Sequence, residues 1–255
     1  LTYTDTTAQA DKDYFVRFGS VKNGIEKLSD EIIVSTFDHV PWENVIALLN
    51  FENGLIDATG KRTWASTDAN VAKVVDTNLL WGSKSLGIIG TALGKCIYTP
   101  DSSDFWFSDG DFGIESSFYL QSKNDFHVIL SQRNNFQSNE SFSFYYFNNA
   151  FSFEYSENGS TATVVSAPFS LNVNQKYDVQ VVRSKTSLKI AVDGNVLIDH
   201  NIGTKSLFNS TVRVVVGQLN ATLNGGYLNG YIDELRVTKG YAPPIKPKRY
   251  KFPTI

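Results

Sequence analysis

Short apolar runs recur along the chain, and turn-forming residues separate them at intervals of roughly 8 to 12 residues. The stretch Gly230–Thr238 reads G-Y-I-D-E-L-R-V-T, which comes close to the alternation that a strand with one buried face needs. Asn148-Asn149 and Asp193-Gly194 are dipeptides that favour tight hairpin turns. No segment longer than a turn or two has a convincing helical period. The pattern therefore predicts an all-β, two-sheet antiparallel sandwich.

The same pattern predicts the individual strands. The run V-I-A-L-L-N-F at 45–51 is short enough to be helix or strand, and we predict a strand because Asn50 and Gly54 break a helix. Further strands are predicted at 114–120, 126–132, 141–147, 151–156, 177–184, 187–192, 196–198, 212–217 and 227–238.

Residues 1–44 differ from the rest of the chain. Leu1–Asp13 is polar, and two apolar runs at 14–18 and 31–36 flank a turn signal at Lys22-Asn23-Gly24. We expect an arm followed by a small β hairpin that serves as an attachment segment, or an arm that pairs with a neighbouring subunit. Because the chain begins with Leu rather than Met, we expect either cleavage during maturation or numbering from within a longer gene product.

The C-terminal end has a different composition again. The main domain is predicted at 45–242, and residues 243–255 combine prolines with the basic residues Lys246, Lys248, Arg249 and Lys251. Proline lacks the N–H donor that a sheet interior needs, so we expect an extended tail. This tail is either solvated or a strap laid over a neighbouring subunit.

Composition narrows the classes of partner. The formal net charge is −3, which gives no surface suited to a polyanion, and we expect no nucleic-acid partner. No apolar run approaches the ~20 residues of a membrane helix, and we expect no membrane partner. Cys96 is the single cysteine, so we expect a small apolar core residue rather than a disulfide.

Several segments resemble sequence boxes of concanavalin A-like, laminin G-like domains, in the version common in bacteriophage virion proteins. The boxes are L-N-F-E-N-G at 49–54, S-D-G-D-F-G-I-E at 108–115, Y-D-V-Q-V-V-R-S at 177–184 and I-D-E-L-R at 232–236. They follow the family's order and cover about 45–244. The resemblance implies a jelly-roll sandwich, and it places a strand within 86–100.

The resemblance implies a protein that holds, displays or binds. Our first expectation is a non-enzymatic structural or decoration protein of a bacteriophage head or tail, displayed on the surface of the virion. Its partners would be other virion proteins, copies of itself and host surface glycans. The alternative is a secreted or cell-surface, and so extracellular, carbohydrate-binding module of a larger bacterial protein.

The resemblance also implies a candidate calcium site. Many laminin G-like domains bind one Ca²⁺ near aspartates of the first and closing strands. The matching residues here are Glu52 and Asp233, with Asp57 nearby. Calcium takes six to eight oxygen ligands, with carboxylates supplying the charge. The alternative is that these carboxylates accept backbone N–H bonds; no other cofactor is expected.

Glycan binding would use exposed aromatic rings with polar neighbours. Trp106, Tyr119 and Tyr145 are the candidate residues, and the two tyrosines occupy strand positions that can face away from the core. The alternative is that all three rings belong to the core, where aromatic residues of a sandwich usually lie.

Catalytic chemistry is not indicated. Glucanases with this fold carry E-x-D-x-E on one strand, and this pattern is missing from the sequence. A retaining glycosidase needs two carboxylates about 5 to 5.5 Å apart, and glycines interrupt the nearest candidates, Asp111 and Glu115. His39, His127 and His200 lack the spacing of metal ligands. We therefore expect no enzymatic activity and no catalytic residues.

Overall fold

The computed structural model describes part of the chain: residues 13–17, 19–22, 24–29, 32–35, 40–77, 80–89, 94–123, 126–134, 138–220 and 226–246. The contacts divide the chain into two compact units, Leu1–Pro41 and Trp42–Ile255. Of the predicted tail at 243–255, residues 243–246 are described and the rest lies outside the described residues.

The first unit contains two short antiparallel strand pairs. β1 (Asp13–Val16) pairs with β4 (Ile32–Ser35), and β2 (Gly19–Lys22) pairs with β3 (Ile25–Leu28). Gly24 in the β2–β3 turn has a φ of 78°, a conformation that glycine adopts without strain. The two apolar runs noted in the sequence thus overlap β1 and β4, and the β2–β3 hairpin lies between these two strands in the chain.

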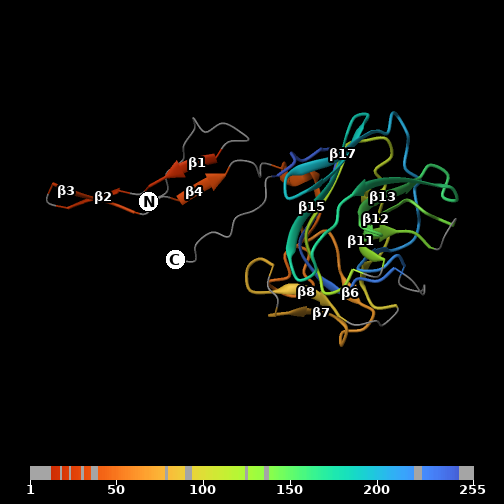
Figure 1. The fold of residues 1–255 in the computed structure, drawn as a ribbon, viewed down its shortest axis with the longest axis horizontal. Coiled ribbons are helices and arrows are strands. Elements are labelled where there is room, and N and C mark those ends of the chain that lie inside the picture. Colours follow the sequence, from red (N-terminus) through yellow and green to blue (C-terminus); the bar gives the residue numbers. More distant parts are fainter. Residues whose placement is uncertain are drawn as a thin grey trace. The chain divides into compact units, whose positions relative to one another are not determined.

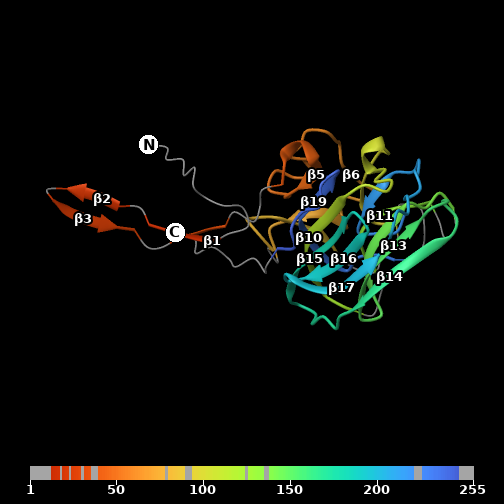
Figure 2. The ribbon, with the colours of Figure 1, turned by 90° about the horizontal axis from the view of Figure 1, so that it is seen from above.

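The second unit is a sandwich of two antiparallel sheets, seen from two directions in Figures 1 and 2. Sheet 1 has the strand order β17-β16-β15-β10-β19-β8-β7, and β5 also pairs with β19. Its strands are β5 (Val45–Leu49), β7 (Ala72–Val75), β8 (Ser85–Ile88), β10 (Phe112–Leu120), β15 (Lys176–Ser184), β16 (Ser187–Val192), β17 (Asn195–Asn201) and β19 (Gly230–Lys239).

Sheet 2 has the order β14-β13-β12-β11-β18-β9-β6. Its strands are β6 (Ala65–Ser66), β9 (Ile97–Thr99), β11 (His127–Gln132), β12 (Phe142–Phe147), β13 (Ala150–Ser156), β14 (Ala162–Pro168) and β18 (Val214–Val216). The edge strands β14 and β17 contact each other, so the two sheets meet along one side (Figure 2).

One hydrophobic core fills the space between the sheets. Along β10, Phe118 and Leu120 point into this core, whereas Tyr119 between them faces outward. Aromatic rings make up much of the filling, and Phe107 stacks on Phe112 with ring centroids 4.4 Å apart. The period-two alternation read from the sequence is thus what buries one face of each strand.

The structure confirms the predicted all-β jelly-roll sandwich and corrects some of its strands. Residues 45–49 form a strand, as predicted. The single strand expected within 86–100 is wrong, because β8 and β9 lie there in different sheets. Strand β14 was not predicted. Among the described residues, helix is limited to two 3-10 turns, η1 (Trp42–Asn44) and η2 (Ser103–Phe105), and neither approaches the length of a membrane span.

Candidate functional site

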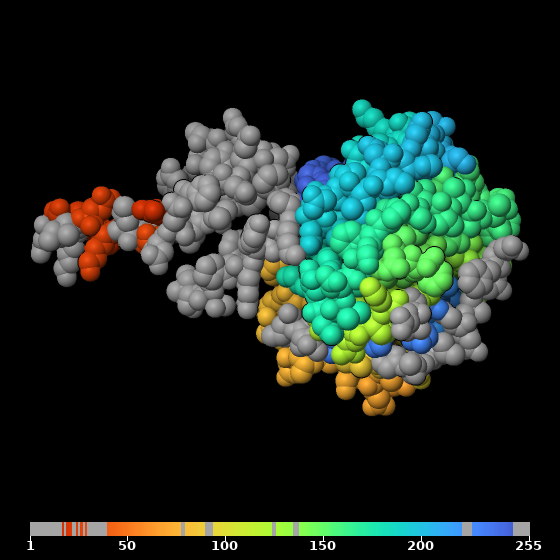
Figure 3. All heavy atoms as spheres, viewed as in Figure 1, coloured from red at the N-terminus to blue at the C-terminus, as the bar shows by residue number. Residues whose placement is uncertain are grey.

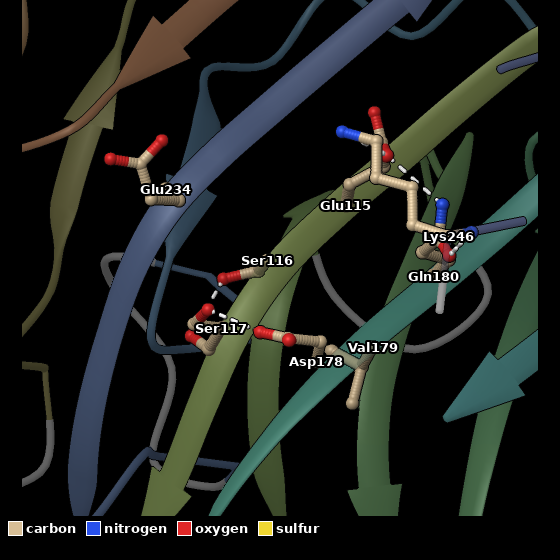
Figure 4. A pocket seen from close by; sticks show the side chains of 8 residues that line it. All are labelled: Glu115, Ser116, Ser117, Asp178, Val179, Gln180, Glu234 and Lys246. Carbon is tan, nitrogen blue, oxygen red and sulfur yellow. Dashed lines mark hydrogen bonds and ion pairs between the residues drawn. The ribbon is translucent and has the colours of Figure 1, made fainter. Parts of the chain in front are cut away.

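Residues 241–246, which we call the C-terminal strap, contact the outer face of sheet 1 through Pro243, Pro244 and Lys246, of which Lys246 is drawn in Figure 4. The side-chain amide of Gln180 binds the strap: Nε2 donates to the Pro244 carbonyl at 3.2 Å, and Oε1 accepts from the Lys246 N–H at 2.9 Å. The Lys246 Nζ atom lies 3.3 Å from Glu115 Oε1. These contacts hold the strap on β10 and β15, so this part of sheet 1 is not open to a ligand.

A small hollow lies beside the strap, lined by the residues drawn in Figure 4. Its volume is about 20 Å³, which accommodates roughly one water molecule and no sugar ring. The hollow lies at a bulge: the register between β10 and β19 shifts there, and Glu234 has a φ of 49°. In Figure 4 the Glu234 side chain points away from the other residues. The hollow itself is therefore not a site for a sugar ligand.

The two predicted calcium ligands both accept hydrogen bonds from residues 81–85, at the end of the connection between β7 and β8. Glu52 Oε1 accepts from the Ser83 N–H at 2.7 Å, and Glu52 Oε2 accepts from Ser83 Oγ at 2.5 Å. Asp233 Oδ2 accepts from the Trp81 N–H at 3.0 Å and from Ser85 Oγ at 3.2 Å. Both carboxylates therefore use their oxygens to fix one turn.

Asp233 is fully buried, and this burial raises the pKa of its carboxyl group to about 7, although hydrogen bonds from neighbouring backbone N–H groups act to lower it. Asp57 accepts from the Leu48 N–H and from Thr59 rather than joining the pair. In the part of the chain that the structure describes, no three His, Cys, Asp or Glu side chains gather as a metal site. Calcium binding at Glu52 and Asp233 stays a prediction, and the geometry matches the alternative of carboxylates that accept backbone N–H bonds.

A second apolar group lies outside the main core, on the outer face of sheet 2. Tyr145 stacks on Phe126 with centroids 4.2 Å apart, and Phe126 contacts Phe147 at 5.1 Å; we call these three residues the aromatic cluster. Alternation along β12 explains its position, because Phe144 and Tyr146 point into the core. Phe147 is 46% exposed, so the cluster presents an open ring.

Hydroxyl groups continue this face across β13 and β14. Ser152 lies opposite Tyr145 on one side and opposite Ser166 on the other, and the two serine Oγ atoms are 2.8 Å apart. Ser166 is exposed, and its neighbour on the same face, Val164, is 50% exposed. The exposed Phe147 ring and the exposed Ser166 hydroxyl on one face are the combination expected of a sugar-binding surface.

A buried charged group lies at the end of the same face. Arg133 Nη2 is 3.0 Å from Glu140 Oε2, and Arg133 Nη1 is 3.0 Å from Glu154 Oε1. The Glu154 side chain is 11% exposed, and the other two are 1% exposed. Burial raises the pKa of the Tyr145 hydroxyl, and the adjacent Glu154 charge raises it further. We call Arg133, Glu140 and Glu154 the charged group.

The structure places the three predicted glycan residues apart. Tyr145 belongs to the aromatic cluster on sheet 2, whereas Tyr119 lies on the outer face of sheet 1, where its hydroxyl is 3.2 Å from Asn174 Oδ1. Trp106 lies in the loop before β10 and donates from Nε1 to the Leu207 carbonyl at 2.9 Å. A single platform of all three is therefore not formed.

The carboxylates considered for catalysis serve separate contacts. Asp111 Oδ1 accepts from the Lys185 N–H at 2.6 Å, and Glu115 Oε2 pairs with Arg236 Nε at 2.6 Å. Phe126, Phe147 and the charged group were not predicted from the sequence. Glu154 is the one charged residue in strands β12 to β14, but the sequence does not indicate its partners.

Comparison with known proteins supports the sandwich fold described above. A family model described as the concanavalin A-like lectin/glucanases superfamily, of the laminin G type, matches residues 94–241. No curated protein matches the chain. In the space-filling view of Figure 3, the coloured sandwich residues form one body without a deep opening on the face shown.

Solved structures share the fold at low sequence identity. One is the binding domain of Paraclostridial mosquitocidal protein 1, with 12% identity, a TM-score of 0.61, and coverage of 78% of this chain and 49% of that chain. Another is domain 4 of AbnA, an extracellular arabinanase from Geobacillus stearothermophilus, in complex with arabinotriose, with 13% identity, a TM-score of 0.59, and coverage of 78% and 94%.

A third structure concerns botulinum neurotoxin type C, whose cell entry depends on interaction with two ganglioside molecules; it has 15% identity, a TM-score of 0.55, and coverage of 77% and 48%. This chain thus spans about half the length of the two toxin chains. At these identities the solved structures establish the shared fold alone, a lectin-like β-sandwich.

Proposed function

The chain belongs to the concanavalin A-like lectin/glucanases superfamily, and from this premise we propose that it is a non-enzymatic module that binds a glycan on the outer face of sheet 2. The observation that carries the proposal is the aromatic cluster, which packs outside the main core and leaves Phe147 46% exposed. A sugar ring can lie against the exposed Phe147 ring while one of its hydroxyl groups bonds to the exposed Ser166.

The outer face of sheet 1 is a weaker candidate. The strap and the β7–β8 turn occupy it, and the hollow between them is too small for a sugar ring. On the outer face of sheet 2, Phe147 at the end of β12 and Val164 and Ser166 on the edge strand β14 are exposed, so a glycan would make contact along this edge of the sheet.

The non-enzymatic part of the proposal is supported by the state of the carboxylates on this face. Glu140 and Glu154 both pair with Arg133 and are nearly inaccessible. Glycoside hydrolysis needs one carboxyl group as an acid and a second as a nucleophile or base, each in reach of the scissile bond. Incubation with the bound glycan should release no reducing ends above the background of buffer alone.

A substitution at Phe147 tests the proposed site. Phe147→Ala should weaken glycan binding about two- to tenfold, because loss of a stacking ring removes on the order of 0.5 to 1.5 kcal/mol. Val196→Ala is the matched control, since Val196 is also an exposed apolar residue, 47% exposed, but lies on the edge strand β17 of sheet 1. Equal binding by both variants in titration calorimetry would contradict the proposal.

In its finer form, we propose that the module is displayed on a bacteriophage particle and attached through its first unit. The ordered sequence boxes of the virion-type laminin G-like domains support this, and so does the separation of Leu1–Pro41 from the sandwich. Mass spectrometry of purified particles should find the chain in a fixed ratio to the other virion proteins.

The alternative is a carbohydrate-binding module of a larger bacterial protein. The specific observation in its favour is that the chain covers 94% of the arabinanase domain but only about half of the toxin chains. Such a module should be recovered from culture medium on an insoluble polysaccharide and should be missing from particles, which separates it from the virion form.

A further inference from the structure

We infer that the glycan bound on the outer face of sheet 2 is uncharged, and that this face discriminates against sugars carrying carboxylate, sulfate or phosphate groups. This inference rests on the proposed function and specifies the ligand class of the same site. It follows from three properties of the face: its charge, the ion pairs already made by the Arg133 guanidinium, and the kind of polar group that it exposes.

The first property is charge. Strands β12, β13 and β14 read F-S-F-Y-Y-F, A-F-S-F-E-Y-S and A-T-V-V-S-A-P, so their only charged residue is the acidic Glu154. The charged group as a whole has one positive and two negative members, which leaves a net charge of −1 when all are ionised. An anionic sugar laid across these strands would therefore approach a like charge.

The second property is the state of Arg133. Recognition of an anion usually uses an arginine fork or a lysine that is free to face the ligand. Both terminal nitrogens of Arg133 already lie 3.0 Å from carboxylate oxygens, and the Arg133 side chain is 1% exposed. Arg213, the next guanidinium along sheet 2, lies over the Tyr98 ring at 4.8 Å, on the far side of β11 from the aromatic cluster.

The third property is the chemistry of the exposed polar atoms. Ser166 is exposed, and its Oγ atom lies 2.8 Å from that of the buried Ser152; Ser131 and Ser143, which are also buried, form a second hydroxyl pair at 2.7 Å. A hydroxyl group donates one hydrogen bond and accepts others, which matches the hydroxyl groups of a neutral sugar. The open part of this surface, at Ser166 and Phe147, is where such a ligand would begin to make contact.

The test compares ligands that differ only in a charged group, using the full chain. Pairs such as galacturonan oligomers with their methyl esters, and sialyllactose with the methyl ester of its carboxyl group, are titrated by calorimetry at low and at high salt. The neutral member of a bound pair should bind at least about tenfold more tightly at low salt, because a like charge near a protein surface is repelled with this order of energy. The difference should shrink at high salt.

A charge added at the rim provides the second measurement. Ser166→Lys should raise the affinity for the anionic member about three- to tenfold at low salt, and the gain should disappear at high salt. Ser166→Gln is the matched control, since it adds length without charge. Ser166 is exposed, so neither substitution is expected to prevent folding.

The outcomes separate the inference from the proposed function. Suppose that the wild-type chain binds the anionic member as tightly as the neutral one, and that Phe147→Ala weakens the binding of both. The inference is then overturned and the proposed function stands. If no glycan of either kind binds, or if binding does not respond to Phe147→Ala, the proposed function fails and the inference fails with it.

Discussion

Asp233 holds a fully buried carboxyl group on the closing strand of the sandwich. Burial raises its pKa from the ordinary 3.8 to about 7. In the unfolded chain this group releases its proton near pH 4, whereas the native state keeps it until about pH 7. Between these values the native state binds more protons, so the contribution of Asp233 to the free energy of unfolding falls as the pH rises.

We therefore compare the free energy of unfolding of the wild type with that of an Asp233→Asn variant. Relative to the variant, the wild-type value should fall by up to about 4 kcal/mol between pH 4 and pH 7, and the difference should be constant above pH 7. Urea unfolding in steps of pH measures this difference. Asp199→Asn, at an exposed position, should retain the wild-type dependence. Parallel stability curves for wild type and Asp233→Asn would show that the carboxyl group is not protonated in the native state.

The oxygens of Glu52 and Asp233 already accept hydrogen bonds from the β7–β8 turn. A bound calcium ion would have to displace these donors, and it would raise the apparent stability of the native state. We expect melting temperatures in 1 mM CaCl₂ and in EDTA to agree within about 1 °C, since an unbound ion gives no such increase. A higher melting temperature in CaCl₂ than in EDTA, lost in the Asp233→Asn variant, would instead establish the predicted site.

At the scale of elements, the strap depends on a close approach to β10. A Cβ atom at Gly113 would lie 2.4 Å from Pro243 Cγ, much closer than two carbon atoms can pack. Gly113 has no positive φ, so its role is to leave space for Pro243 rather than to relieve backbone strain. The strap can therefore be loosened by a single methyl group.

Gly113→Ala should lower the free energy of unfolding by about 1 to 3 kcal/mol, as overpacking usually does. In a chain that ends at residue 242 the same substitution should cost clearly less, because Pro243 is no longer there to clash. Urea unfolding of the four proteins gives the coupling energy directly. Equal costs in the two backgrounds would mean that the strap does not press on β10.

The elements that the sequence predicted well are those with strict alternation and strong turn residues, such as β10, β15 and β19. Strand β14 escaped prediction because Val164 and Val165 are adjacent, so apolar residues face both sides, and it is an edge strand with Val164 exposed. The charged group could not be predicted, because Arg133, Glu140 and Glu154 are brought together by strand pairing and not by spacing along the chain. Tyr145 was predicted on a sheet face, but its partner ring Phe126 was not.

At the scale of the whole molecule, the chain joins a large unit with a continuous core to a small one. Two isolated strand pairs bury little apolar surface on their own and are marginal in water. The sandwich has its own core from both sheets. The first unit is therefore expected to contribute attachment rather than stability or ligand binding.

Removal of residues 1–41 tests this division, because the contacts separate the chain between Pro41 and Trp42. The remaining chain should melt cooperatively within about 3 °C of the full chain, since its core is intact, and should keep the glycan affinity that depends on Phe147. It should no longer associate with particles. Calorimetry, glycan titration and co-sedimentation with particles measure the three properties separately. A shortened chain that keeps its affinity and still sediments with particles would locate attachment on the sandwich itself.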